Sequence, residues 1–212
     1  MTAEWYNIYI VFDRRSFDLR GAARLPEGPA RTAAVAAWIQ SLYETRPPVL
    51  VGGAAVELYT GGAYTTGDFD FIGDVPDSVG EALKQAGFKR EGRHWIHSEA
   101  ELYVEFPGSA VQPHERAAKV KFGKVSVLVL SPEDMIVDRL AAWQFWNSTT
   151  DGASAFLLWK AQEKKLSRKR LGTLARKRGV EKAFDRLTEF VRGKAARMPS
   201  EAELEQWARR RP

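Results

Sequence analysis

The chain has 212 residues, of which 44% are hydrophobic and 28% are charged, and these values are typical of a globular protein with a sizeable buried core. The absence of cysteine excludes disulfides, thiolate metal sites and a cysteine nucleophile. No apolar run approaches the roughly 18 residues that a membrane span requires. The first residues also lack the basic start and apolar core of a signal peptide. We therefore expect a cytoplasmic protein without a membrane partner.

The net charge of +5 conceals an asymmetry along the chain. Residues 155–212 contain 17 Lys and Arg against 7 Asp and Glu, whereas residues 1–154 contain 15 against 20. An acidic part that suits a cation is thus joined to a basic part that suits a polyanion, unless the basic helices simply present solvated faces.

Short helices and strands are predicted to alternate over residues 1–130. Hydrophobic periodicity, glycines and prolines set the boundaries of these elements. Strands are expected at residues 5–12, 49–51 (running into a glycine turn at 52–53), 68–72, 92–98 and 100–107. A hairpin is expected at residues 117–130, with its turn at Gly123-Lys124. Helices are expected at residues 34–42, 54–59 and 80–88.

The pattern changes to helical from Ser131 onward. Ser131 suits an N-cap, Pro132 the first helical position, and two acids follow in the first turn. The apolar face of this helix is expected to include Trp143 and Trp146, and further helices are expected at residues 153–162, 169–178, 180–191 and 201–209. The sequence therefore predicts an α+β protein, with a mixed sheet and flanking helices in residues 1–130 and a basic helical bundle in residues 131–212.

Two aspartates interrupt the apolar strand DFDFI. Asp68 and Asp70 are two residues apart, so they point to the same face of the strand, opposite Phe69 and Phe71. Two neighbouring carboxylates repel each other unless a cation lies between them, and Mg²⁺ prefers oxygen ligands. Glu105 occupies the polar face of the later strand LYVEF, so it is the candidate for a third metal-binding carboxylate.

A glycine pair, Gly52-Gly53, directly follows the strand at residues 49–51. Glycines at the start of a helix let a phosphate approach the backbone N–H groups. A tight turn between strand and helix would require the same residues, and both interpretations stay open here.

This combination resembles the nucleotidyltransferase superfamily of DNA polymerase beta-like fold, and in particular the minimal bacterial branch around AbiEii-type abortive-infection toxins. The family pattern is a hydrophobic strand with Gly-[Gly/Ser], then [Asp/Glu]-x-[Asp/Glu], then a third acid. The motif positions here are Gly52 and Gly53, then Asp68 and Asp70, then Glu105. The helix that begins Ser-Pro-Glu-Asp resembles the family's first bundle helix, and Asp151 matches an acid that starts the next one.

The resemblance implies an enzyme that transfers a nucleotidyl group from an NTP to an acceptor hydroxyl. Asp68, Asp70 and Glu105 would be catalytic and bind Mg²⁺ or Mn²⁺, while Gly52, Gly53 and Thr66 would bind the nucleotide. The acceptor could be an RNA or tRNA end bound by the basic C-terminal helices. A toxin–antitoxin role with an antitoxin partner would follow from the same resemblance.

One departure from the pattern supports an alternative. Relatives commonly carry a basic residue four positions before the first aspartate, and this chain has Tyr64 there. The protein could therefore be a catalytically weakened relative that acts as an interaction or regulatory (antitoxin-like) module. A third hypothesis is nucleic-acid binding by the basic segment at residues 164–178 alone, which would be salt-sensitive.

The remaining polar candidates are interpreted as structural. His94 and His97 are three apart on a predicted strand, so they should point to opposite faces and not share a metal. We expect both at the surface or an interface. Glu57 follows the glycine pair and is expected to be a solvated helical acid.

Overall fold

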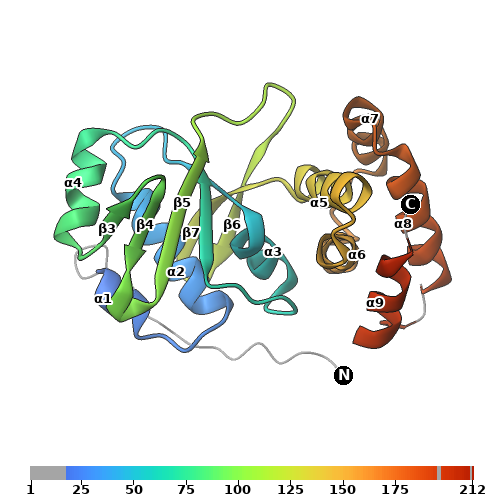
Figure 1. Ribbon diagram of the computed structural model, residues 1–212, viewed down its shortest axis with the longest axis horizontal. Helices are drawn as coiled ribbons and strands as arrows, with labels where there is room; N and C mark the ends of the chain where they lie inside the picture. The colour runs from blue at the N-terminus through green and yellow to red at the C-terminus, as the bar shows by residue number, and fades with distance from the viewer. Residues whose placement is uncertain (1–17, 195–196, 211) are drawn as a thin grey trace.

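The computed structural model describes residues 18–194, 197–210 and 212, so the strand predicted at residues 5–12 lies outside the described residues. Among the described residues, seven strands form one mixed sheet of order β3-β4-β5-β2-β1-β7-β6 (Figure 1). The strands are β1 (Val49–Val51), β2 (Asp68–Ile72), β3 (Lys89–Glu91), β4 (His94–His97), β5 (Leu102–Gly108), β6 (Ala117–Phe122) and β7 (Val125–Leu130). The predicted α+β class with a mixed sheet is confirmed.

Strand β2 lies at the centre of this sheet. It pairs in parallel with β5 and antiparallel with β1, and Asp70 stands opposite Glu105 on one side and Val51 on the other. Phe69 and Phe71 are buried, whereas Asp68 is exposed and Asp70 is half-buried. The alternation expected of a strand with one face in the core is thus present.

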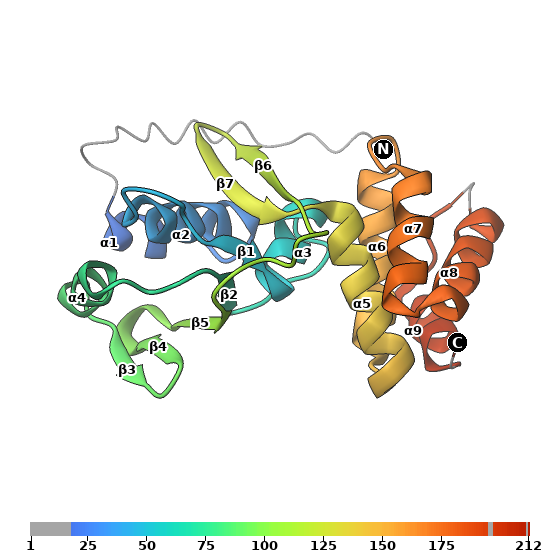
Figure 2. The same cartoon turned by 90° about the horizontal axis from the view of Figure 1, so that it is seen from above.

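Helices of the first part surround the sheet. They are α1 (Leu19–Ala23), α2 (Pro29–Ser41), α3 (Gly52–Thr60) and α4 (Asp77–Gln85), with a short 3-10 turn at Ser98–Ala100. Helix α3 contacts β1 and β2, and α2 contacts β7. Figure 2 shows α1 and α2 along one side of the strands, away from β3 and β4.

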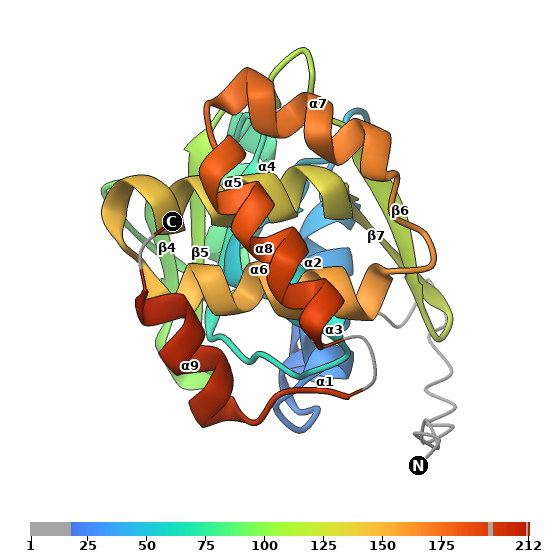
Figure 3. The same cartoon turned by 90° about the vertical axis from the view of Figure 1, so that its right-hand side faces the viewer.

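After β7 the described chain is helical. The helices are α5 (Pro132–Trp146), α6 (Thr149–Gln162), α7 (Arg168–Arg178), α8 (Glu181–Gly193) and α9 (Glu201–Arg209). Helices α5 and α6 pack together and against α3, and α7, α8 and α9 lie outside them (Figure 3). The division into two domains stays a prediction, although every described strand ends by Leu130.

Helix α5 begins as predicted, because the Asp134 backbone N–H donates to the Ser131 hydroxyl (3.3 Å). Trp143 is buried, as expected, and its Nε1–H donates to the Ala208 carbonyl (2.7 Å). The prediction for Trp146 was wrong: 77% of its surface is exposed. Trp146 is the last residue of α5, and with its neighbour Phe145, which is 56% exposed, it lies beyond the packed part of the helix.

In the part of the chain that the structure describes, every helix is too short or too polar to cross a lipid bilayer.

Candidate functional site

The three predicted carboxylates come together on neighbouring strands. Asp70 on β2 is the direct register neighbour of Glu105 on β5, and Asp68 is the neighbour of Tyr103. Because side chains two apart on a strand share a face, Asp68, Asp70 and Glu105 lie on one side of the sheet. Their placement together follows the prediction, while their chemical role stays a prediction.

Asp70 is in an environment that disfavours its ionised form. Burial is the main cause that raises its pKa, and the negative charges of Glu105 and Asp68 raise it further. The positive charges of Arg139 and His94 act in the opposite direction but do not cancel the increase. A cation at this position would relieve the repulsion between the carboxylates.

Gly52 is the residue that lets Asp70 lie against the start of α3. Its φ is +65°, and an added Cβ would lie 2.0 Å from the Asp70 Oδ2 atom. An added Cβ on Gly53 would lie 3.0 Å from both Cβ and Oγ1 of Thr66. The Thr66 hydroxyl in turn accepts a hydrogen bond from the Asp68 backbone N–H (3.3 Å). The glycine pair, Thr66 and the two aspartates are therefore one contiguous group of residues, with a left-handed glycine at the turn.

Glu105 has partners that the sequence did not indicate. Its Oε1 atom lies 2.8 Å from Arg93 Nε, and its Oε2 atom lies 3.5 Å from His94 Nδ1. His94 is half-exposed on β4, and His97 lies on the opposite face with its ring edge against Phe88. The expectation of two histidines on opposite faces holds, but His94 lies beside the carboxylates.

A second missed residue is Arg139 on α5. Its Nη1 lies 2.6 Å from the Asp151 Oδ1 at the start of α6, and its charge acts on Asp70. Tyr64, where relatives commonly carry the basic residue, is half-buried and packs against the apolar core. Arg139 is the single basic residue in the sequence of α5, and this isolation in a largely apolar helix was the available signal.

The donors present fit a hard cation only in part. The described residues contain no group of three or more His, Asp or Glu side chains arranged to hold a metal ion. Asp68 and Asp70 offer the oxygen ligands that Mg²⁺ prefers. Glu105 would have to give up its contact with Arg93 to become a third ligand. The residues that could hold a metal are therefore the aspartates first and Glu105 second.

A pocket of about 250 Å³ adjoins the Thr66 side of this group, and Glu57 is part of its wall. The prediction of a solvated Glu57 was wrong: only 1% of its surface is exposed, and the Thr32 hydroxyl donates to its Oε2 (2.8 Å). Burial raises the pKa of Glu57, although the hydrogen bonds from Thr32 and the Thr66 backbone lower it in part. Helix α3 packs against both the sheet and α2, so this helix has no fully solvated face.

Comparison of the chain with protein-family models, with curated proteins and with solved structures finds no match. The resemblance to nucleotidyltransferases accordingly stays a prediction that is based on the residues themselves.

Proposed function

We propose that the protein is a metal-dependent nucleotidyltransferase that moves a nucleotidyl group from an NTP to an acceptor hydroxyl. The observation that carries the proposal is the contact between Gly52, at the start of α3, and Asp70, the register neighbour of Glu105. This contact joins a helix N-terminus that suits a phosphate to carboxylates that suit a divalent cation.

In this proposal Asp68 and Asp70 hold Mg²⁺ or Mn²⁺. The ion would supply charge neutralisation for the phosphates and activation of the attacking oxygen. The backbone N–H groups at Gly52 and Gly53 would bind the triphosphate, because the first N–H groups of a helix have no partner within the helix. Thr66 lies against Gly53 and keeps this turn in place.

The reaction would break the phosphoanhydride bond between the α- and β-phosphates of the NTP and form a phosphoester bond to the acceptor. The acceptor oxygen attacks the α-phosphorus and releases its proton to solvent water, and pyrophosphate leaves with the bridging oxygen. Arg139, whose positive charge acts on Asp70, would stabilise negative charge on the departing phosphates. Glu105 is held by Arg93, so we assign it to positioning the acceptor hydroxyl.

A specific observation favours the second candidate, a weakened relative that acts as an interaction module. Glu105 already has a cationic partner in Arg93, and Tyr64 packs into the core without a charge. Such a protein would keep the fold and bind neither metal nor NTP with useful affinity.

Label transfer separates the two candidates. The protein is incubated with each α-labelled NTP, total RNA and Mg²⁺, and labelled RNA is detected after electrophoresis. The enzyme proposal predicts labelled RNA with the unaltered protein and a loss of at least 100-fold in rate with Asp68→Asn plus Asp70→Asn. Failure to label RNA, together with no labelled protein or small acceptor, would favour the interaction module.

A further inference from the structure

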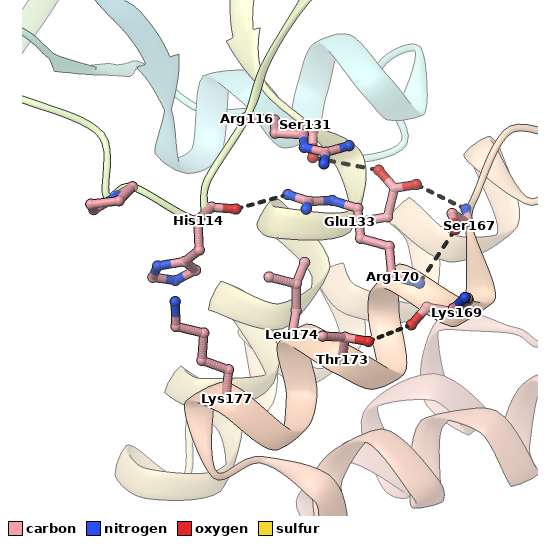
Figure 4. Close-up of a pocket in the computed structure, with 11 residues that line it drawn as sticks. His114, Arg116, Ser131, Glu133, Ser167, Lys169, Arg170, Thr173, Leu174 and Lys177 are labelled. Carbon is pink, nitrogen blue, oxygen red and sulfur yellow. Dashed lines mark hydrogen bonds between the residues drawn. The ribbon is translucent and has the colours of Figure 1, made fainter.

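A separate pocket lies where the helical part meets the loop between β5 and β6. Its volume is about 650 Å³, which is in the range of small-ligand sites. The described residues that line it include four basic side chains and one acidic side chain, Glu133. The basic ones are Arg116, Lys169, Arg170 and Lys177 (Figure 4). The pocket shares no lining residue with the carboxylate group of β2 and β5.

Glu133 offsets one of the four positive charges of the wall, and its carboxylate caps α7. One oxygen accepts from the Ser167 backbone N–H (2.8 Å) and the other from the Ser131 hydroxyl (3.4 Å). Glu133 is 8% exposed, and the neighbouring Asp134 carboxylate is paired with Arg170, so four cations face two carboxylates and positive charge remains in excess.

Arg170 is held in place across the pocket. Its Nη2 donates to the His114 carbonyl (3.2 Å) and to the buried Asp134 carboxylate (2.5 Å). Figure 4 shows this side chain extending from α7 toward the His114 segment. A fixed guanidinium loses little further entropy on binding a ligand, so Arg170 is preorganised.

The other three cations are available to a ligand. Among the described residues, the side chains of Arg116, Lys169 and Lys177 have no ion pair or hydrogen bond, and all three are exposed. Lys177 approaches the His114 ring from the far end of α7 (Figure 4). Three like charges around one opening repel each other, and a polyanionic ligand would remove this repulsion.

The start of α7 adds to the same potential. Its first turn contains Arg168, Lys169 and Arg170 and no acid of its own, and the Glu133 carboxylate at the cap offsets one of these three positive charges beside the partial positive charge of the helix end. Basic residues at this end cost stability in the free protein. An anion in the pocket would make the arrangement favourable.

We propose that this pocket binds the phosphate groups of a nucleotide-sized ligand, either a free nucleotide or a nucleotide unit of an RNA strand. This goes beyond the proposed transferase function, since the pocket needs neither a metal nor the aspartates. If both proposals hold, the pocket would bind the acceptor strand next to α5, the helix that also contains Arg139.

The test measures binding in EDTA, with AMP and with a fluorescein-labelled 12-nucleotide single-stranded RNA as probes. Lys169→Ala plus Lys177→Ala removes two exposed charges without touching the Arg170–Asp134 pair. We expect at least a tenfold loss of affinity for the probe that binds. For RNA we also expect the slope of log K against log salt to fall by about 1.4, at about 0.7 per lost phosphate contact.

Three controls make the result specific. Lys182→Ala plus Arg192→Ala removes the same charge from exposed positions on α8 and should change affinity less than twofold. Lys169→Arg plus Lys177→Arg should retain binding. Asp68→Ala plus Asp70→Ala should also retain it, so a failed transferase proposal does not affect this one.

Each outcome decides the proposal. If the RNA binds more tightly than AMP, the ligand of the pocket is an RNA strand. If the two probes bind with equal affinity, the ligand is a free nucleotide. The proposal is overturned if neither probe binds. It is also overturned if the α7 and α8 double variants lose the same affinity, because the effect would then reflect overall charge.

Discussion

The close approach of Gly52 to Asp70 gives the sharpest prediction about the site. Alanine at position 52 would need a φ of +65°, which costs an L-residue about 1–2 kcal/mol. Its Cβ would also lie 2.0 Å from Asp70 Oδ2, so the carboxylate must leave its rotamer or the backbone must shift, at a further cost of about 1–3 kcal/mol. Gly52→Ala should therefore lower the free energy of unfolding by about 2–5 kcal/mol.

Gly179 is a matched control for this prediction. It has a φ of +66° at the end of α7, but an added Cβ there would meet nothing within 4 Å. Gly179→Ala should cost only the backbone term of about 1–2 kcal/mol. Urea unfolding followed by circular dichroism measures both variants, and the difference between them is the contribution of the contact with Asp70.

A double-mutant cycle tests the contact itself. In the Asp70→Ala background, Gly52→Ala should cost at least about 0.5 kcal/mol less than in the unaltered protein. The reasoning is refuted if Gly52→Ala costs no more than Gly179→Ala, or if Gly52→Ala and Asp70→Ala are additive.

Three further predictions follow from the same structure. Because the pKa of Asp70 is raised, the folded state favours the neutral form of this carboxyl group. Protonated Asp70 therefore stabilises the folded protein relative to the unfolded chain below the unfolded pKa, and this contribution is lost as the pH rises through the folded pKa. In EDTA at pH 7, Asp70→Asn should thus stabilise the protein by about 0.5–2 kcal/mol, and a thermal-melt difference that is equal at pH 4 and pH 7 would contradict this. Trp143→Ala should lower the free energy of unfolding in urea by about 3–5 kcal/mol, and Trp146→Ala by less than about 0.5 kcal/mol, because Trp143 is buried and Trp146 is exposed. Equal losses would contradict this difference in burial. Arg93→Ala should free Glu105 and tighten Mg²⁺ binding severalfold in a calorimetric titration, and unchanged affinity would mean that Glu105 is no ligand.

Period-two alternation is the reason that the carboxylates could be placed from the sequence. Asp68 and Asp70 alternate with two phenylalanines, so any strand with a buried face puts both acids on the other face. Glu105 follows the same rule in its own strand. The register that makes it the neighbour of Asp70 depends on how β2 and β5 pair, which the local pattern does not determine.

The partners of the site could not be predicted in the same way, because they come from other elements. Glu105 meets Arg93 and His94 through the β4–β5 pairing, and the positive charge of Arg139, which is held by Asp151, acts on Asp70 from α5. The error at Trp146 differs in kind, because its spacing from Trp143 fits the buried face and only its position at the end of α5 leaves it exposed.

Two short elements were also missed. Helix α1 has only five residues, and β3 has three exposed residues, so neither has enough apolar periodicity to be recognised. Each is stabilised by its neighbours: α1 contacts α2, and β3 pairs with β4. Tertiary packing therefore determines these elements more than local preference does.

Calorimetric titration of each NTP, with Mg²⁺ and then with EDTA, tests the proposed metal and nucleotide site at Asp68 and Asp70. It compares the unaltered protein with Asp68→Ala plus Asp70→Ala, and with Asp185→Ala plus Glu189→Ala as a control that removes the same charge from exposed positions on α8. We expect Mg²⁺-dependent binding of at least one NTP to the unaltered and control proteins, and loss of that binding in the Asp68 and Asp70 variant. Binding that is the same in all three proteins, or that does not depend on Mg²⁺ in any of them, would contradict the proposed transferase site.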